Sequence, residues 1–78
     1  MARLVLFAQA REFAGTSQAE VDAATVGEVL DAAVARYGPA FAAVVGFSAI
    51  WLNGDPAERD TAVTANDEVA VLPPVSGG

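Results

Sequence analysis

The chain has 78 residues, with ten acidic and four basic side chains, a formal net charge of −6, and no Cys, His or Lys. The missing thiols and imidazoles exclude zinc sites, iron–sulfur sites, thiol redox chemistry and nucleophilic catalysis by Cys or His-activated Ser. The acidic balance and the scattered arginines predict that nucleic acid is not a partner. With 54% apolar and 18% charged residues, the composition is that of one small folded domain.

Neither the first residues nor the longest apolar stretch has the pattern of a targeting or membrane segment. The opening MARLVLFAQARE contains an apolar stretch that is too short for a signal peptide, and no cleavage-like site follows it. Residues 40–52 are mostly apolar, but a helix needs about 20 residues to cross a bilayer. We therefore expect a cytoplasmic protein with no membrane partner.

The first predicted elements are two strands. Residues 3–8 alternate between two apolar sides, with Leu4 and Leu6 on one side and Val5 on the other, which is typical of a central strand. After a Gly-Thr break, residues 17–21 have the polar and β-branched character of a weaker strand. We expect the second strand to return beside the first.

A helix is predicted in the middle of the chain. Thr25 followed by Glu28 is a capping-box pattern, in which both side chains satisfy backbone N–H groups of the first helical turn. Gly38-Pro39 predicts the end of the helix, because proline cannot continue the hydrogen-bond ladder. An apolar stripe at helical spacing joins the two ends and consists of Val26, Val29, Leu30, Ala33, Val34 and Tyr37.

The second half of the chain predicts a short helical turn and then a hairpin. Residues 40–45 are expected to form the turn, and residues 49–52 a strand. Asn53-Gly54 is the strongest hairpin signal in the sequence, because both residue types tolerate positive φ. Residues 55–59 would form the returning edge strand, weakened by a proline.

The last predicted strand covers residues 68–72 and follows a turn at residues 65–67, with Val69 and Val71 on one face. If the first and last strands lie side by side in parallel, one main helix packs across a mixed sheet. This order predicts an α+β fold of the β-grasp, ubiquitin-like type. We expect this domain to span residues 1–72, and residues 73–78 to form an extended tail that ends in Gly-Gly.

Two carboxylate clusters are the candidates for acid–base chemistry inside the domain. They are Asp55 with Glu58 and Asp60, and Asp67 with Glu68. Paired carboxylates catalyse proton transfer when burial separates their pKa values. Both clusters stand beside turn-forming residues, so we interpret them as solvated turns. Neither has the spacing of an EF-hand loop, and we expect no metal site.

The C-terminal segment differs from a plain loop. Two prolines fix an extended backbone, and six residues reach roughly 20 Å. Glycine lacks a Cβ and passes through channels too narrow for other residues. The group delivered is the α-carboxylate of Gly78, which must be activated, for example by adenylation, before it carries anything. Because the chain has no Cys, a carried sulfur would replace an oxygen of that carboxylate. The alternative is an inert, frayed tail.

Three stretches together resemble the small subunit of molybdopterin synthase, the MoaD family of ubiquitin-like sulfur carriers. They are the opening LFAQAREFAGT, the Asn-Gly turn, and the ending NDEVAVLPPVSGG. The similarity extends over nearly the whole chain, although residues 40–51 are less diagnostic. Two positions depart from the family pattern: Asn66 replaces a glycine, and Trp51 replaces a small aliphatic residue. We interpret Trp51 as a core or sheet-face aromatic, with a partner contact as the alternative.

The resemblance implies a sulfur-carrying cycle. An E1-like adenylyltransferase and sulfurtransferase would consume ATP to adenylate Gly78, and a sulfur donor would convert the adenylate to a thiocarboxylate. The large, MoaE-like subunit would form a heterotetramer with this chain and receive the tail. Sulfur would then pass to cyclic pyranopterin monophosphate during molybdenum cofactor biosynthesis. No permanently bound cofactor is implied, and the catalytic residues would belong to the large subunit.

The candidate site residues follow from the tail and the resemblance. Gly78 is the expected attachment point, and Gly77 precedes it. Phe7 and Val5 would contact a partner if a helix covers the Leu4 face of the sheet; a core on both faces is the alternative. Arg11 would orient the tail or pair with a partner carboxylate, or be simply solvated. The remaining candidates for partner binding are Pro73, Pro74, Val75 and Ser76.

Three other functions remain open. One is the thiamine-pathway sulfur carrier, which also ends in Gly-Gly but fits the FAQARE opening and PPVSGG ending less well. Another is a ubiquitin-like modifier that forms isopeptides with lysines of other proteins. The chain has no Lys, so lysine-linked polymers of it are impossible. The last is a structural binding module with an inert tail.

Overall fold

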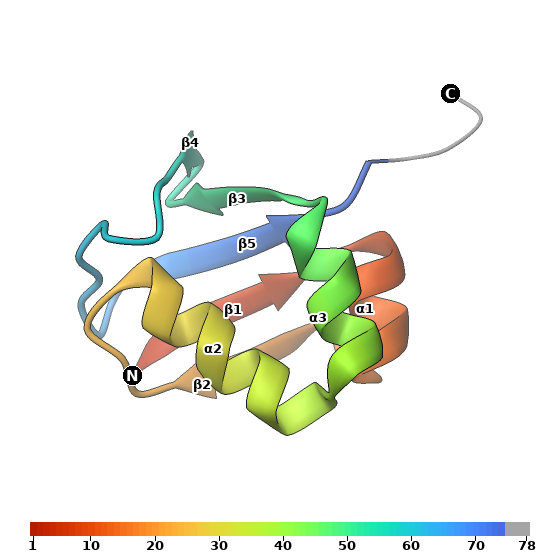
Figure 1. The fold of residues 1–78 in the computed structure, drawn as a ribbon. Helices are drawn as coiled ribbons and strands as arrows, with labels where there is room; N and C mark the ends of the chain where they lie inside the picture. The colour runs from red at the N-terminus through yellow and green to blue at the C-terminus, as the bar shows by residue number, and fades with distance from the viewer. Residues whose placement is uncertain (75–78) are drawn as a thin grey trace.

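The computed structural model describes residues 1–74, which form a mixed five-stranded sheet and three helices (Figure 1). The strand order is β2-β1-β5-β3-β4. The strands are β1 (Ala2–Leu6), β2 (Gln18–Val21), β3 (Ala49–Leu52), β4 (Asp55–Pro56) and β5 (Glu68–Leu72). The helices are α1 (Ala8–Ala14), α2 (Val26–Tyr37) and α3 (Pro39–Gly46).

The first and last strands lie side by side at the centre of the sheet and run in parallel, as predicted. Leu4 pairs with Val69 and Leu6 with Val71. On the other side of β1, strand β2 is antiparallel, and on the other side of β5, strand β3 is antiparallel. The mixed sheet with a helix packed across it confirms the predicted β-grasp fold.

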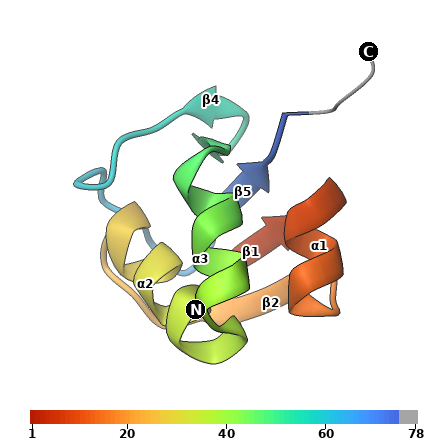
Figure 2. The same ribbon diagram turned by 45° about the vertical axis from the view of Figure 1, so that its right-hand side comes forward.

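The core lies between the sheet and the helices. In both views α2 and α3 cover the same face of the sheet, and α1 lies at the end where β1 and β5 finish (Figures 1 and 2). Phe41 of α3 is the largest fully buried side chain, and its ring meets that of Tyr37 edge-on at 5.2 Å. The buried apolar residues are Ala2, Leu4, Leu6, Ala10, Val21, Val26, Val29, Leu30, Ala33, Phe41, Val44, Val63, Val69 and Val71.

Helix α2 begins and ends where the sequence predicts. The Thr25 hydroxyl accepts a hydrogen bond from the backbone N–H of Glu28 at 3.1 Å. The Glu28 carboxylate accepts one from the backbone N–H of Ala24 at 3.0 Å, so both capping side chains satisfy N–H groups near the helix start. The helix stops at Gly38, whose φ of 94° lies in the left-handed region that favours glycine.

Three sequence predictions were wrong in extent. The strand expected at residues 3–8 ends at Leu6, because Ala8 takes a φ of 49° and begins the unpredicted α1. The short turn expected at residues 40–45 is instead the two-turn helix α3, since Pro39 takes the first helical position, where its missing N–H costs nothing. The edge strand expected at residues 55–59 is only the two-residue β4, because Pro56 cannot donate to a ladder.

Candidate functional site

The face of the sheet opposite the helices carries exposed apolar side chains. Strand alternation places Val5 beside Ala70, and Ala70 beside Trp51, across three neighbouring strands. A second row, one pleat nearer the end of β5, joins Leu72 to Ala49. We call this surface the open sheet face and define it by Val5, Phe7, Ala49, Trp51, Ala70 and Leu72.

This exposure contradicts a core on both faces of the sheet. Leu4 and Leu6 are buried under the helices, whereas Val5 is only half-buried. Phe7 continues the alternation beyond β1 and is 45% exposed, and Trp51 is 38% exposed. Trp51 was predicted to be a core or sheet-face aromatic, and this exposure makes it a sheet-face aromatic. Apolar patches of this kind on a small protein are typical of interaction surfaces.

The end of β5 directs the chain out of the fold beside this surface. Pro73 is buried and Pro74 is exposed, so Pro74 is the point at which the described chain leaves the domain. Phe7 lies next to this exit, since its backbone N–H donates to the carbonyl of Val71 at 3.3 Å. The predicted site residues Val75, Ser76, Gly77 and Gly78 lie outside the described residues.

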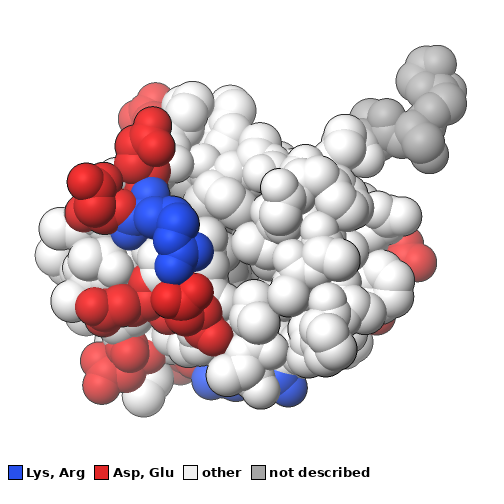
Figure 3. Space-filling model, viewed as in Figure 1, with Lys and Arg blue, Asp and Glu red and all other residues white. Residues whose placement is uncertain are grey.

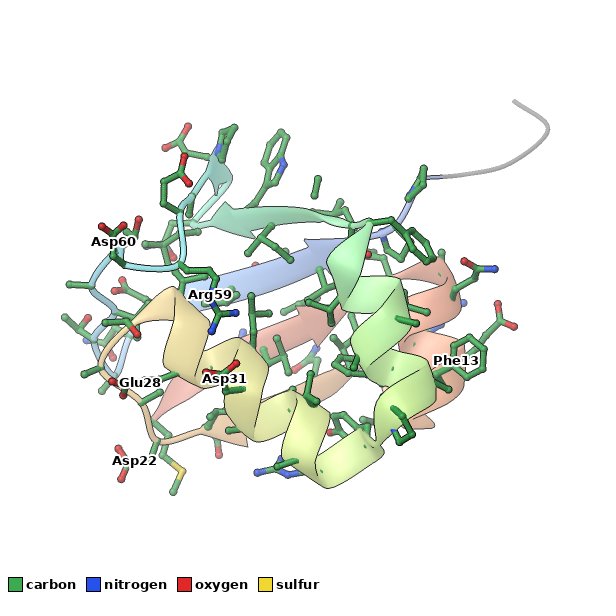
Figure 4. The ribbon with its side chains drawn as sticks, viewed as in Figure 1. Phe13, Asp22, Glu28, Asp31, Arg59 and Asp60 are labelled. Atoms are coloured by element: carbon green, nitrogen blue, oxygen red, sulfur yellow. The ribbon has the colours of Figure 1, made fainter. Side chains whose placement is uncertain are left out.

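Most of the charged side chains lie away from this exit, and Arg11 and Glu12 on α1 are the exceptions at this end. Figure 3 shows most of the visible acidic side chains at the end of the molecule that holds the start of α2 and a smaller acidic group at the opposite edge, while most of the surface over α3 is uncharged. Figure 4 places Asp22, Glu28, Asp31, Arg59 and Asp60 at that same acidic end and Phe13 at the other. Residues 4–10, 37–54 and 69–78 contain no charged side chain, and β-pairing brings these three segments together around the end of β5.

Arginines stabilise the acidic end. Arg59 donates to both carboxylate oxygens of Asp31 at 2.9 Å, and its backbone carbonyl accepts from the N–H of Gly27 at 2.7 Å. Arg3 pairs with Glu68 at 3.7 Å. These are the ion pairs within residues 1–74, and Arg11 takes part in neither. Arg11 is exposed on α1, so the structure is compatible with each role predicted for it.

The two carboxylate clusters have different environments. Asp55, Glu58 and Asp60 are exposed in and after β4. The pKa of Asp67 lies below its ordinary value, chiefly because the side-chain amide of Asn53 donates to its carboxylate and also because the backbone N–H of Thr64 does so. A catalytic proton donor needs a raised pKa, so Asp67 is a structural acceptor that ties the Asn-Gly hairpin to the turn before β5.

Replacing Asp67 with Asn is expected to lower the free energy of unfolding at neutral pH, because Asn53 and Thr64 donate to different carboxylate oxygens and the amide replaces one of these acceptors with an NH2 donor. The folded-state pKa of Asp67 is depressed. Its contribution is therefore fully present above the unfolded-state pKa of about 3.9 and is lost as pH falls through the folded-state pKa.

Urea unfolding between about pH 6 and pH 2 tests this expectation. The wild type should lose more stability on acidification than the Asp67→Asn variant. The Asp60→Asn variant serves as the control, because Asp60 is exposed in a neighbouring loop. Equal pH dependence in the wild type and the Asp67→Asn variant would refute the assigned role.

The described residues contain further surfaces that bear on the site. A shallow hollow of about 290 Å³ lies between Met1, Arg3 and Asn66 at the acidic end, away from the chain exit. Phe13 and Phe47 are 52% and 53% exposed, and neither was predicted to be a surface residue. Phe47 stands in the mostly apolar stretch of residues 40–52, and nothing in the sequence around either residue marked it as exposed. Within residues 1–74, no helix is long and apolar enough to span a membrane.

Comparison with known proteins identifies related sequences and folds. The chain matches the ThiS family over residues 4–78. It is 39% identical over 83 residues to small archaeal modifier protein 1 of Haloferax volcanii, covering 94% of this chain and 95% of that protein. The crystal structure of SAMP1 from Haloferax volcanii has a TM-score of 0.87 at 39% identity, with 99% of this chain and 98% of that chain covered. The putative molybdopterin converting factor subunit 1 of Pyrococcus furiosus has a TM-score of 0.80 at 26% identity, with 95% and 97% covered.

Proposed function

Because the chain belongs to the ThiS family of ubiquitin-like sulfur carriers, we propose that it carries sulfur as a thiocarboxylate on Gly78. We propose further that it is the sulfur-donating subunit of a molybdopterin synthase and acts in the cytoplasm. The single observation that carries the proposal is the place where β5 ends. β5 ends beside an exposed apolar surface, and the segments that it meets there in the sheet carry no charged side chain.

The proposed chemistry begins with activation of the carboxylate. The Gly78 carboxylate attacks the α-phosphorus of ATP and releases pyrophosphate, which yields an acyl adenylate on an E1-like enzyme. A sulfide-level sulfur nucleophile then attacks the acyl carbon and displaces AMP, leaving a thiocarboxylate. Both steps need catalytic groups that the partner supplies, since this chain has no His, Cys or Lys to act as base or nucleophile.

The tail has the properties that delivery requires. Two prolines restrict the backbone and lower the entropy cost of entering a narrow site. Gly77 lacks a Cβ, so it lets a partner channel close around the backbone next to Gly78. We assign Pro74, Val75 and Ser76 to the channel entrance, where Arg11 on α1 would pair with a partner carboxylate. Pro73 was also predicted to contact the partner, but it is buried and would anchor the tail to the domain instead.

The open sheet face provides the docking surface in this proposal. Its aromatic members, Phe7 and Trp51, are the residue types that contribute most to interface affinity when a partner buries them. A large subunit that receives the tail would cover this face at the same time. The similarity to the Pyrococcus furiosus protein, a putative molybdopterin converting factor subunit 1, supports that acceptor.

The Phe7→Arg variant is expected to bind the large synthase subunit at least about tenfold more weakly than the wild type, because an apolar contact is replaced by an unpaired charge in a closed interface. The fold should survive, since Phe7 is 45% exposed and makes no side-chain cap bond to α1. Titration calorimetry measures the Kd. Phe13→Arg is the matched control, because Phe13 is 52% exposed and lies away from the open sheet face. A folded Phe7→Arg variant with wild-type affinity would remove Phe7 from the docking surface.

A second function, protein modification, is favoured by the 39% identity to small archaeal modifier protein 1. It would begin with the same adenylate, after which a lysine amine of a target protein displaces AMP and forms an isopeptide. The last arginine before the tail is Arg59, so trypsin would leave residues 60–78 on a modified lysine. Mass spectrometry of target proteins for that remnant distinguishes a modifier from a sulfur carrier. A thiamine-pathway carrier would instead give sulfur to a different acceptor than cyclic pyranopterin monophosphate.

A further inference from the structure

We propose that Phe47 is a contact residue for the ATP-dependent enzyme that activates Gly78, on the side of the chain exit opposite Phe7. This inference rests on the proposed function and adds a residue that neither the open sheet face nor the tail includes. The surface that contacts Phe47 would be an apolar part of the activating enzyme, next to the site where that enzyme binds ATP. Three observations support the assignment: the reach of the tail, the lack of charge along the rim formed by α3 and β3, and the exposure of Phe47.

The tail is too short to separate Gly78 from the domain surface. Gly78 is four residues beyond Pro74, and four extended residues span at most about 14 Å. An enzyme that holds the Gly78 carboxylate against ATP must therefore lie within that distance of Pro74. Because a protein is much larger than this distance, it must touch the residues that surround the exit.

Phe47 is one of those surrounding residues. It is the C-terminal cap of α3, and it precedes by two residues Ala49, which pairs with Leu72. Pro74 follows Leu72 by two residues, just as Phe47 precedes its partner Ala49 by two. Since β3 and β5 are antiparallel, the segment before β3 and the segment after β5 leave the sheet at the same end. Phe7 flanks β5 on its other side through the bond from its N–H to the carbonyl of Val71.

The chemical character of this rim predicts what binds it. No charged residue occurs between residues 37 and 54, so the rim contributed by α3 and β3 is apolar and uncharged. The Phe47 side chain is 53% exposed, which leaves about half of an aromatic surface available to a partner. Burial of that area favours association in proportion to the area removed from water. The acidic residues labelled in Figure 4, Asp22, Glu28, Asp31 and Asp60, lie at the other end of the molecule, which keeps their charge away from the triphosphate of ATP.

The Phe47→Ser and Phe47→Leu variants of the full chain test the inference. The assay is pyrophosphate exchange with a purified E1-like adenylating enzyme, with KM for this chain and kcat measured separately. We expect Phe47→Ser to raise KM at least about fivefold with little change in kcat. Phe47→Leu retains an apolar side chain and should stay within about twofold of the wild type. The control is Asn66→Ser, since Asn66 is exposed and lies in the turn before the start of β5, at the opposite end of that strand from the exit, and its KM should not change.

The outcomes separate this inference from the function on which it rests. No exchange with the wild-type chain would overturn both. Exchange by the wild type with an unchanged KM for Phe47→Ser would overturn the role of Phe47 alone. An equal increase in KM for Phe47→Ser and Asn66→Ser would also overturn it, because the effect would not be local to the exit. A change in sedimentation with Phe47→Ser and no change in KM would assign the residue to self-association, which contradicts the proposal.

Discussion

Deletion of Gly78 is expected to abolish ATP-dependent activation of the chain while leaving its thermal stability unchanged. The deletion moves the terminal carboxylate back by one residue, a shift of about 3.5 Å, and places it on Gly77. A misplacement of this size removes the alignment that brings the carboxylate to the α-phosphorus of ATP, and such losses cost 100-fold or more, to order of magnitude. Pyrophosphate exchange measures activation, and we expect a signal at background.

Stability should not change, because the apolar core cluster within residues 1–74 lies between Ala2 and Val71. Thermal unfolding of the deletion variant and the wild type provides the check. A second variant, Gly78→Ala, keeps the chain length and adds one Cβ, so it separates the effect of position from that of side-chain volume. Activation of the deleted chain at a rate close to that of the wild type would contradict a mechanism that uses the Gly78 carboxylate.

Replacing Phe41 with Ala is expected to lower the free energy of unfolding by about 3–5 kcal/mol. Phe41 has no exposed surface and is the largest fully buried side chain. Its ring packs against Tyr37 at 5.2 Å, and it belongs to α3, which contacts both other helices. Truncation would leave a cavity that the small helices cannot fill without moving apart.

This loss is a large share of the roughly 5–15 kcal/mol that stabilises a typical domain. Urea unfolding at neutral pH measures it from the shift in midpoint at constant slope. Phe13→Ala is the matched control, since its ring is 52% exposed, and it should cost less than about 1 kcal/mol. A loss for Phe41→Ala as small as that of the control would contradict the central place of α3 in the core.

Sequence patterns predicted the elements whose signals are local and strong. The Thr25 cap, the Gly38-Pro39 stop and the Asn53-Gly54 hairpin were each correct, because each depends on side chains next to the backbone that they constrain. Asn53 and Gly54 have the predicted positive φ values, 52° and 87°. The parallel pairing of the first and last strands also followed from the order of elements.

Helix α1 could not be predicted from the same kind of evidence. Phe7, its N-terminal cap, makes no side-chain cap bond, so no capping signal marks its start. Helix α3 has apolar residues around most of its circumference, so its sequence does not show the one apolar face that marks an amphipathic helix. Both helices depend on tertiary packing, since α3 contacts α1 and α2, and a local pattern does not contain that information.

The site was predictable only in part, for a related reason. Alternation along β1 placed Val5 and Phe7 on the face opposite Leu4, and the structure leaves that face open. The sequence alone did not decide whether a second layer covered it. Phe47 was missed because its position beside the chain exit depends on the pairing of Ala49 with Leu72, two residues that are 23 positions apart in the chain.

The intact mass of the full-length chain, measured after incubation with ATP, a sulfide source and a purified E1-like adenylating enzyme, tests the central claim most directly. We expect a gain equal to the replacement of one oxygen by sulfur. Fragmentation should place this gain on Gly78, and the Gly78-deleted chain should show none. An unchanged mass in the presence of an enzyme that consumes ATP with this chain would contradict the sulfur-carrier account.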